Sequence, residues 1–377
     1  VSAMNNDKPR LLIFHPALAP YRLDFFNALA DRFTCHVVLL QRENPALFIK
    51  QDQLLAEARF TYAYLDRHFT LAGRDINLGY ASAIRHFRPD IVLCSEFNLS
   101  VLSAAFYRWR HSRRFRLFTM CDDSIAMAER CLGGRRRRRS ALIRCLDGIV
   151  NISEETAAWF LRHTPARRTF SFPIIRAEQS FVCHRPTAAR YVSTHHLAGM
   201  KVGLFVGRFV DVKNLPALIE AFHRVCERNA AAANYRLVLV GSGEQANRLQ
   251  AQAAAAGLAD RVIFPGAFTG QDLWAWYATA DFLVLCSSSE AFGAVVNEAL
   301  LGGCRAMVST YAGARELIGC DNGKVFDALN AEDFYTTLQQ AYASAAPTPA
   351  EAFERPSRMP ISFTERIEAL SRFLLSD

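Results

Sequence analysis

The segment KVGLFVGRFVDVKNLPALIEAF, residues 201–222, contains the signals that decide the fold. It opens with a short apolar run that predicts a buried strand, and Gly207 allows the chain to turn where that strand ends. The residues that follow favour the start of a helix. An apolar strand that leads through a glycine turn into a helix is typical of a βα unit in a parallel sheet.

The same rhythm of apolar runs and helix-period segments extends in both directions along the chain. Downstream, strands are expected at 234–241, 261–266, 281–287 and 305–310, with helices between them that include 244–256. Upstream, strands are expected at 10–16, 35–41, 59–65, 90–96, 115–120 and 147–153, with helices at 21–33, 77–87 and 140–146. Right-handed βαβ units in this order predict an α/β protein with two Rossmann-like, doubly wound domains.

The domain boundaries follow from the points where this rhythm breaks. A chain of 377 residues suits two domains. Residues 176–198 have no clear period and read as a linker, so we expect an N-terminal domain over 1–185 and a C-terminal domain over 199–350. Residues 351–377 end in an amphipathic helix, 362–375, whose apolar positions need a partner surface.

Charge and hydropathy limit the kinds of partner that the chain can bind and the compartment in which we expect it. The net charge is +8, and the excess lies in the N-terminal half, which favours an anionic partner such as phosphate, lipid headgroups or nucleic acid. The densest run, Arg135 to Arg139, is equally consistent with a solvated helix start and with a membrane-surface role. It lacks the interleaved aromatics of a nucleic-acid site. No secretory or membrane-spanning segment is readable, so we expect a cytoplasmic protein, peripheral at most on the inner face of the membrane.

The ten cysteines do not predict a metal site. They are scattered through the chain, several sit inside apolar runs, and no C-x-x-C pair occurs. Cysteines in this arrangement are typical of reduced, buried core residues, and we expect no metal.

The loop after the strand at 201–206 carries two cations, Arg208 and Lys213. Two cations five positions apart at a helix start suit a diphosphate. The alternative is that both are ordinary surface cations, and the loop alone favours that interpretation.

A second cluster spans Ser287 to Gly303 and reads SSSEAFGAVVNEALLGG. We expect Glu290 to end the loop, Phe292 and Gly293 to open the next helix, and Glu298 to lie about two turns along it. A helix N-terminus favours phosphate, and the two carboxylates suit sugar and ribose hydroxyls. Glu290 as a cap and Glu298 as a surface charge explain the spacing equally well.

Taken together, these clusters closely resemble the C-terminal domain of glycosyltransferase family 4, the retaining GT-B enzymes. The resemblance runs through residues 203–222, 237–249, 262–268, 290–303 and 312–318 in the family's order. It implies two domains facing a central cleft, with the helix within 351–377 crossing back to the N-terminal domain. It also implies a nucleotide-sugar donor and catalysis without a metal.

The resemblance implies a role for each matching residue. Arg208 and Lys213, after Gly207, match the donor-diphosphate cations, and Glu290 matches the residue that contacts the transferred sugar. The remaining donor-binding matches are the loop Ala291, Phe292 and Gly293, the ribose-binding Glu298, and Phe268 near the base. The chain departs from the usual pattern at Ala291, Asn297, Arg305 and Ala312-Gly313, and two of these, Ala291 and Ala312, bear on donor identity.

The N-terminal half resembles the family less, and its best stretch is HPALAPYRLDFFNALADRF, residues 15–33. This stretch is similar to related enzymes acting on bacterial surface polysaccharides. The family's middle-strand His is missing, because the strand at 115–120 runs into Cys121-Asp122-Asp123. Asp122 or Asp123 either orients a hydroxyl or caps the next segment. The acceptor-side candidates are His15, Pro16, Tyr21, Arg22, Glu96 and Asp123, with Asp122 as a catalytic candidate.

These observations predict a retaining hexosyltransferase of bacterial polysaccharide, lipopolysaccharide or capsule biosynthesis. The donor would be a UDP- or GDP-sugar and the acceptor a glycan or lipid-linked hydroxyl. Three alternatives remain: a nucleotide-sugar epimerase, a glucan synthase-like enzyme, and a nucleotide-sugar-binding protein without turnover.

Overall fold

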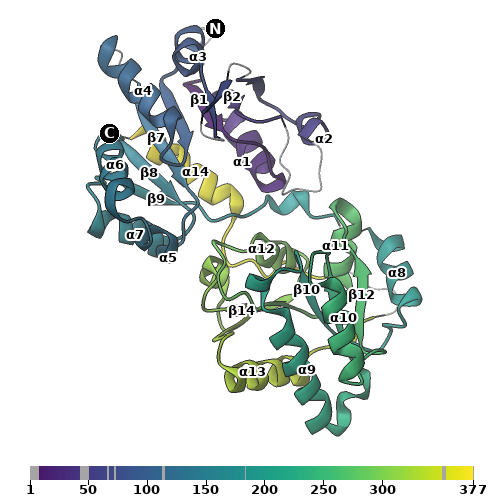
Figure 1. The fold of residues 1–377 in the computed structure, drawn as a ribbon. Helices are drawn as coiled ribbons and strands as arrows, with labels where there is room; N and C mark the ends of the chain where they lie inside the picture. Colours follow the sequence, from purple (N-terminus) through teal and green to yellow (C-terminus); the bar gives the residue numbers. More distant parts are fainter. Residues whose placement is uncertain are drawn as a thin grey trace. The chain divides into compact units, whose positions relative to one another are not determined.

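The computed structural model describes residues 8–42, 51–65, 68–71, 74–112, 115–182, 184–349 and 354–376. The chain forms two compact units (Figure 1). Unit 1 consists of residues 1–173 together with 363–377, and unit 2 of residues 174–362. Within the described residues, no helix combines the length and apolarity that crossing a membrane requires.

Unit 1 is built on a seven-stranded parallel sheet with the order β3-β2-β1-β6-β7-β8-β9. The strands are β1 (Arg10–His15), β2 (Thr34–Leu39), β3 (Thr61–Tyr64), β6 (Ile91–Ser95), β7 (Arg116–Cys121), β8 (Gly148–Asn151) and β9 (Thr169–Ser171). A separate antiparallel hairpin pairs β4 (His68–Leu71) with β5 (Arg74–Asn77). The central strands are apolar throughout because helices cover both faces of a parallel sheet.

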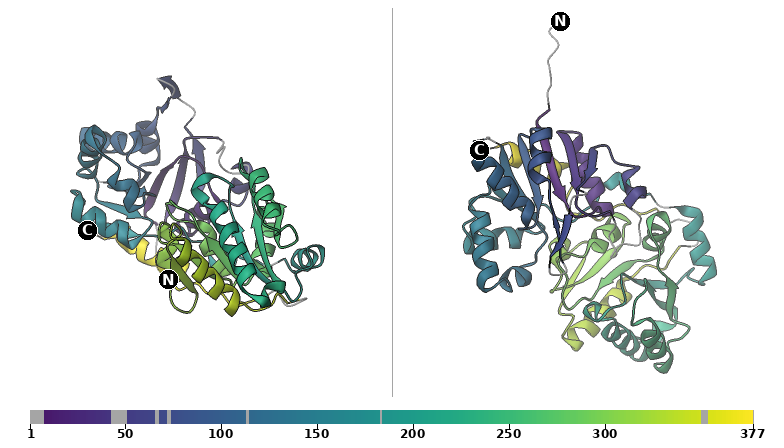
Figure 2. Two further views of the ribbon diagram at one scale, coloured as in Figure 1. Left: turned by 60° about the horizontal axis from the view of Figure 1, so that its bottom comes forward. Right: turned by 45° about the horizontal axis from the view of Figure 1, so that its top comes forward.

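Right-handed crossovers sort the helices of unit 1 onto two faces. One face is covered by α3 (Tyr80–Phe87), α4 (Leu99–Arg110), α5 (Ile125–Glu129), α6 (Gly133–Ile143) and α7 (Glu154–His163), whose buried residues join one core cluster. The opposite face carries α1 (Pro20–Ala30), α2 (Gln51–Leu55) and α14 (Phe363–Leu375). Figures 1 and 2 show α14, at the end of the chain, lying against unit 1. This return of the last helix agrees with the expected architecture.

Unit 2 repeats the plan with a six-stranded parallel sheet in the order β12-β11-β10-β13-β14-β15. Its strands are β10 (Lys201–Val206), β11 (Tyr235–Val240), β12 (Val262–Gly266), β13 (Phe282–Leu285), β14 (Arg305–Ser309) and β15 (Gly323–Phe326). The core on one face is built with α9 (Leu215–Arg228), α10 (Ala246–Ala255) and α13 (Ala331–Ser344). The remaining helices are α8 (Arg185–Thr194), α11 (Gly270–Thr279) and α12 (Ala294–Leu301), and α8 packs on α11.

Both sheets reverse their strand order at the centre, next to β1 in unit 1 and next to β10 in unit 2. Open α/β sheets bind ligands outside the carboxyl ends of the strands at such a switch point. In unit 1 these ends lead to His15, Glu96 and Cys121. In unit 2 they lead to Gly207 and to the loop before Glu290.

The expected two Rossmann-like sheets are confirmed, whereas several boundaries differ from the predicted ones. The contact boundary falls between Pro173 and Ile174, so residues 174–185 belong to unit 2 rather than to the first domain. Residues 351–362 also belong to unit 2. The predicted linker 176–198 contains helix α8 of unit 2, which was missed because its buried side is short and includes Thr187 beside Ala188, Tyr191 and Val192.

Candidate active site

The loop after β10 packs so closely against the loop after β11 that glycine is required at the points of contact. Gly207 has φ +152°, and Gly241 has φ +149°. A Cβ on Gly241 would lie 1.8 Å from the Gly207 carbonyl oxygen, and one on Gly243 would lie 2.5 Å from the Phe209 carbonyl oxygen. The Gly241-Ser242-Gly243 segment therefore packs directly against the Arg208 loop, which gives this segment a structural role.

The two predicted cations of this loop have different surroundings. Lys213, at the end of the short 3-10 turn Asp211–Lys213, forms an ion pair with Glu290, and the two side chains are 16% and 20% exposed. Arg208 is exposed, and its side chain has no hydrogen bond or ion pair with the described residues. The fold thus brings together Lys213 and Glu290, which are 77 positions apart, and leaves Arg208 open to solvent on the same loop.

Glu290 ends the loop, as expected, but the helix that carries Glu298 begins at Ala294, so Phe292 precedes it. Glu290 lies in the loop before α12, where its backbone N–H donates to the Tyr311 carbonyl at 3.1 Å and it forms an isolated bridge with Ala312. Ser287 Oγ also donates to its carboxylate at 3.4 Å. These contacts fix the Glu290 backbone against the neighbouring strand-end loop.

The loop Ala291–Gly293 passes tightly over Gly313. A Cβ on Gly313 would lie 2.4 Å from the Ala291 carbonyl oxygen, so glycine is needed at that position. Its neighbour Ala312 is buried and accommodated, which accounts for a single glycine where the family has a pair. Phe292 is buried, and its carbonyl accepts the Ala314 N–H at 2.8 Å.

Helix α12 begins immediately after Gly293, which occupies the N-cap in the left-handed region with φ +104°. Gly293 offers no capping side chain, and no acidic residue lies in the first turn. The helix therefore presents backbone N–H groups and its positive dipole end beside the Lys213–Glu290 pair, a combination that favours a phosphate. Glu298, on the second turn of α12, accepts a hydrogen bond from the Tyr277 hydroxyl at 2.8 Å.

Phe268 belongs to an aromatic cluster that the sequence did not reveal. Its half-buried ring lies 5.6 Å from the Tyr191 ring and 6.0 Å from the Trp276 ring, and the last two rings stack at 4.4 Å. Tyr191 comes from α8, inside the segment expected to be a linker. A ring edge next to the loop after β12 suits contact with a planar base.

Asn297, where the family usually has leucine, is fully buried beside Glu298. Its Oδ1 accepts the Arg176 N–H at 2.8 Å, and its Nδ2 contacts Met359 Sδ at 3.2 Å. Arg176 and Met359 lie on the two segments through which the chain enters and leaves unit 2. The amide therefore ties α12 to both segments.

In unit 1, the predicted residues of the β1–α1 region converge on Asp122. Arg22 is buried and donates to both oxygens of Asp122, at 2.5 and 2.7 Å. The guanidinium also lies 5.3 Å from the Tyr21 ring, and burial raises the pKa of Tyr21. Burial, together with the Arg22 charge, lowers the pKa of His15 to about 3, so this imidazole is neutral at physiological pH.

Pro16, the sixth acceptor-side candidate, has a structural role in this unit. Its carbonyl accepts the N–H groups of Leu40 and Gln41, at 3.2 and 2.9 Å, and thereby joins the loop to the end of β2. No described contact connects the Pro16 side chain with the charged groups near Asp122.

Glu96 follows β6 in a left-handed backbone conformation, φ +61°, which is unusual for a residue other than glycine. Its Oε1 accepts the Asp122 N–H at 2.9 Å, and its own carbonyl accepts the Thr119 hydroxyl at 2.7 Å. Burial, reinforced by the Asp122 charge, raises the pKa of Glu96 to about 7. A strained backbone and a carboxyl that titrates near neutrality are both typical of functional positions.

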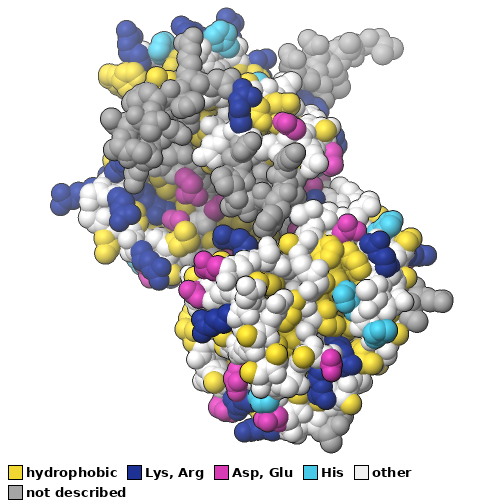
Figure 3. All heavy atoms as spheres, turned by 45° about the vertical axis from the view of Figure 1, so that its right-hand side comes forward, with side chains coloured by type: hydrophobic (Ala, Val, Ile, Leu, Met, Phe, Trp, Pro, Cys, Tyr) yellow, Lys and Arg dark blue, Asp and Glu magenta, His cyan; other side chains and the backbone are white. Residues whose placement is uncertain are grey.

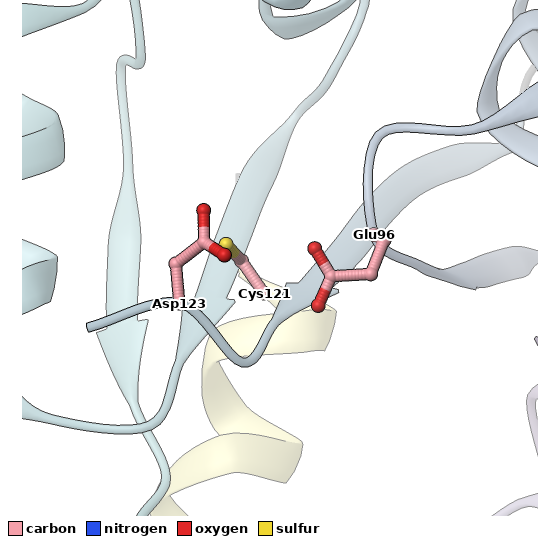
Figure 4. Close-up of side chains that lie close together, drawn as sticks. All are labelled: Glu96, Cys121 and Asp123. Carbon is pink, nitrogen blue, oxygen red and sulfur yellow. The ribbon is translucent and has the colours of Figure 1, made fainter. Parts of the chain in front are cut away.

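Asp123 takes part in a compact cluster with Cys121 and Glu96 (Figure 4), the one grouping among the described residues whose side chains could together ligate a metal. However, the Arg139 guanidinium already supplies the positive charge. It donates to Asp123 at 2.7 Å and contacts the Cys121 sulfur at 3.2 Å. Burial also raises the pKa of the Cys121 thiol well above its ordinary value, whereas a metal ligand must be a thiolate. The donor set fits an arginine better than a metal ion.

Arg139 is a site residue that sequence reasoning missed, because it was read as one member of the run from Arg135. The arginines before it are exposed, but the Arg139 side chain is 11% exposed and lies over the Phe97 and Phe160 rings at 4.4 and 4.8 Å. The signal was helical spacing, since Arg139 shares a face with Leu142 and Ile143.

Two doubly wound parallel sheets, each with polar groups at its switch point, define the GT-B class of folds. Residues 195–355 match the family Glycosyl transferases group 1, which assigns a glycosyltransferase domain to unit 2. Along most of its length the chain resembles the structure of Anabaena HepE in complex with UDP and glucose. The TM-score is 0.73 and the identity 17%, covering 98% of this chain and 100% of HepE.

Curated relatives match over a part of the chain. An uncharacterized glycosyltransferase of Methanocaldococcus jannaschii is 36% identical over 118 residues, which are 31% of this chain and 29% of that protein. The lipopolysaccharide core biosynthesis glycosyltransferase LpsE of Rhizobium meliloti is 30% identical over 147 residues, 39% of this chain and 41% of that protein. The chain thus spans less than half the length of these curated relatives.

Proposed function

We propose that this protein is a retaining glycosyltransferase of family 4 that moves a hexose from a nucleoside-diphosphate sugar to an acceptor hydroxyl. The observation that carries the proposal is the convergence of Lys213, Glu290 and the N-terminus of α12 at the switch point of unit 2. This geometry supports a site in which a diphosphate and the sugar attached to it are held side by side.

In the proposed reaction, the bond between the anomeric carbon and the donor diphosphate oxygen breaks. A bond to the acceptor oxygen forms on the same face of the sugar, and the hydroxyl proton passes to the leaving phosphate. Arg208, Lys213 and the N–H groups of α12 would stabilise the charge that grows on the diphosphate. These positive groups take the part of a divalent metal, so we propose that none is required. Glu290 would hold the sugar through hydrogen bonds.

The donor and acceptor classes are proposed from chemistry and similarity together. Phe268 and its aromatic neighbours suit a base, and Glu298 suits the ribose hydroxyls. The likeness to HepE with UDP and glucose supports a UDP-hexose, and a GDP-hexose is the other donor that we propose. The match to LpsE supports a glycan or lipid-linked acceptor in bacterial surface-polysaccharide synthesis, on the cytoplasmic side of the membrane.

The charged cluster of unit 1 is proposed to bind the acceptor. Glu96 and Asp122 offer carboxylate oxygens at the ends of the neighbouring strands β6 and β7. Arg22 holds the Asp122 side chain in place, and Arg139 holds that of Asp123. Asp122 would take the orienting role of the missing family His. Neutral His15, buried next to Arg22, would pack against the site as a polar side chain and would not act as a base.

A donor panel tests the proposal. Melting temperatures would be measured with UDP-, GDP-, ADP- and dTDP-sugars, since a bound donor stabilises the fold by mass action. Products of the best donor would then be analysed with and without glycan acceptors. Retained anomeric configuration in a transfer product supports the proposal. Epimerised donor without any acceptor, or tight binding with no turnover, would instead support the epimerase or the non-catalytic alternative.

A further inference from the structure

Helix α4, in the outer layer of unit 1, exposes a line of large apolar side chains to solvent. Four residues at spacings of three, four and three share this line: Leu99 (40% exposed), Leu102 (52%), Phe106 (60%) and Trp109 (75%). The opposite side of the helix is buried in the core through Val101, Ala104 and Tyr107. Residues at these spacings lie on one helical face, so the line points directly away from the sheet. We call these four residues the α4 stripe.

The residues of the α4 stripe form a continuous row on one helical face and are not isolated exposed side chains. Single exposed apolar residues are ordinary, but large ones that follow one another along a helix mark an interaction surface. Phe106 and Trp109 also contact each other, with ring centroids 5.7 Å apart. The most exposed member is the tryptophan at the C-terminal end of the helix.

The charges beside the α4 stripe are arginines without acidic partners. Arg110 ends α4, and Arg85 and Arg88 end α3, which packs along α4 on the same face of the sheet. All three are exposed and have no ion pair with the described residues. The exposed arginines 135–138, equally unpaired, begin α6 on this same helical layer. Asp90, which follows α3, accepts a hydrogen bond from the backbone N–H of Arg10 and forms no ion pair with these exposed arginines.

We propose that the α4 stripe and its flanking arginines dock unit 1 onto an anionic lipid bilayer. The apolar line would enter the boundary between headgroups and acyl chains, and Arg85, Arg88 and Arg110 would contact lipid phosphates. Positive charge without acidic counterparts favours a lipid surface over a second copy of this chain, which would bring the same arginines into opposition. The purpose of docking, access to a lipid-linked acceptor, rests on the proposed function.

Sedimentation with vesicles tests the docking independently of activity. We expect the full chain to pellet with phosphatidylglycerol-containing vesicles, to pellet less with pure phosphatidylcholine, and to lose its preference as salt screens the charges. The double variant F106S/W109S should bind at least ~tenfold more weakly, because two large apolar side chains no longer leave water. The pair R85Q/R88Q should lose mainly the preference for anionic lipid.

Matched controls come from unit 2, where basic and acidic side chains are interspersed over the face drawn in Figure 3. Leu329 is 60% exposed, the same as Phe106, and Arg248 is an exposed arginine of α10. L329S and R248Q should bind vesicles like the unaltered chain. Equal binding by F106S/W109S, or its conversion of a dimer to a monomer in vesicle-free ultracentrifugation, would overturn the docking proposal. Transfer to a water-soluble acceptor should be unchanged in F106S/W109S, so failure of docking and failure of the proposed transferase are told apart.

Discussion

Lys213 combines partial burial with a partner from a distant loop. Its ammonium group meets the Glu290 carboxylate beside the start of α12, where a donor phosphate would contact both the ammonium group and the positive end of the helix. Arg208 differs because it is exposed and unpaired in the described structure. We therefore assign the fixed part of the electrostatic stabilisation to Lys213 and expect Arg208 to engage only when the donor is bound.

Replacing Lys213 by alanine should lower kcat for transfer by roughly 10²- to 10³-fold, the usual effect of removing one preorganised group that stabilises developing charge. Released nucleoside diphosphate measures the rate. K324A removes an exposed lysine of the same unit and should leave the rate unchanged. Full activity of K213A, with its fold verified by thermal melting, would remove Lys213 from the mechanism.

Glu96 predicts a pH dependence of stability. Because its pKa is raised from 4.5 to about 7, the folded chain keeps a proton that the unfolded chain releases. Its contribution is complete below pH ~4.5 and declines as pH rises toward 7, the reverse of an ion-paired carboxylate. E96Q keeps the oxygen that accepts the Asp122 N–H but does not titrate. Urea unfolding should show E96Q gaining roughly 2 to 3 kcal/mol relative to wild type between pH 5 and pH 8; parallel pH profiles would refute the raised pKa.

At the scale of elements, the donor site depends on backbone contact between loops. Gly207 and Gly241 end neighbouring strands β10 and β11, and their close approach holds the Arg208 loop in place. No side chain can enter this contact without displacing the loop. The strand-end geometry of unit 2 is thus set by main-chain atoms as much as by the charged residues.

G241A should disturb this geometry, because its Cβ would collide with the Gly207 carbonyl. We expect at least ~2 kcal/mol lower stability of unit 2 and weaker donor binding, measured by unfolding and by titration with the donor. Gly257 is the matched control, since it has φ +66° but nothing within 4 Å of an added Cβ. G257A should cost only ~1 kcal/mol of left-handed strain and leave donor binding intact. Equal effects of both variants on binding would contradict a role for the contact.

The sequence predicted the elements better than it predicted how loops and helix ends are arranged. Apolar runs identified the central strands because burial on both faces requires them. Phe292 was expected to open the helix together with Gly293, but the left-handed Gly293 is the N-cap and the helix begins at Ala294. A pairing such as that of Glu290 with Tyr311 and Ala312 depends on which strands are neighbours, and one sequence does not contain that information.

Side chains inside charge runs and departures from the family pattern were also beyond sequence reasoning. Arg139 is distinguished from its neighbours only by its place on the apolar face of α6, and its partner Asp123 comes from another loop. Arg305 was identified only as a departure from the family pattern; the structure shows an ion pair with Asp281 and a hydrogen bond to the Ser344 carbonyl at 2.9 Å. Such long-range polar contacts become visible only once the fold is known.

On the scale of the whole molecule, the chain builds unit 1, then unit 2, and then returns to complete unit 1 with α14. The helix buries Phe363, Ile367, Leu370 and Leu374 there. Arg116 and Arg168 donate to carbonyls at its C-terminal end, where cations complement the helix dipole. The stability of the first unit therefore depends on the last residues of the chain.

Substitution of Leu370 by alanine tests this dependence. Leu370 is fully buried, so L370A should destabilise unit 1 by ~2 to 4 kcal/mol through lost burial and the cavity left behind. No residue of α14 belongs to the described core cluster of unit 2. The melting transition of unit 2 and its affinity for the donor should therefore remain as in the unaltered chain. Leu375, on the same helix but 46% exposed, provides the control, and L375A should stay within ~0.5 kcal/mol. Calorimetry that resolves the two transitions decides the matter, because an equal loss of stability in both units would mean that α14 does not act through unit 1 alone.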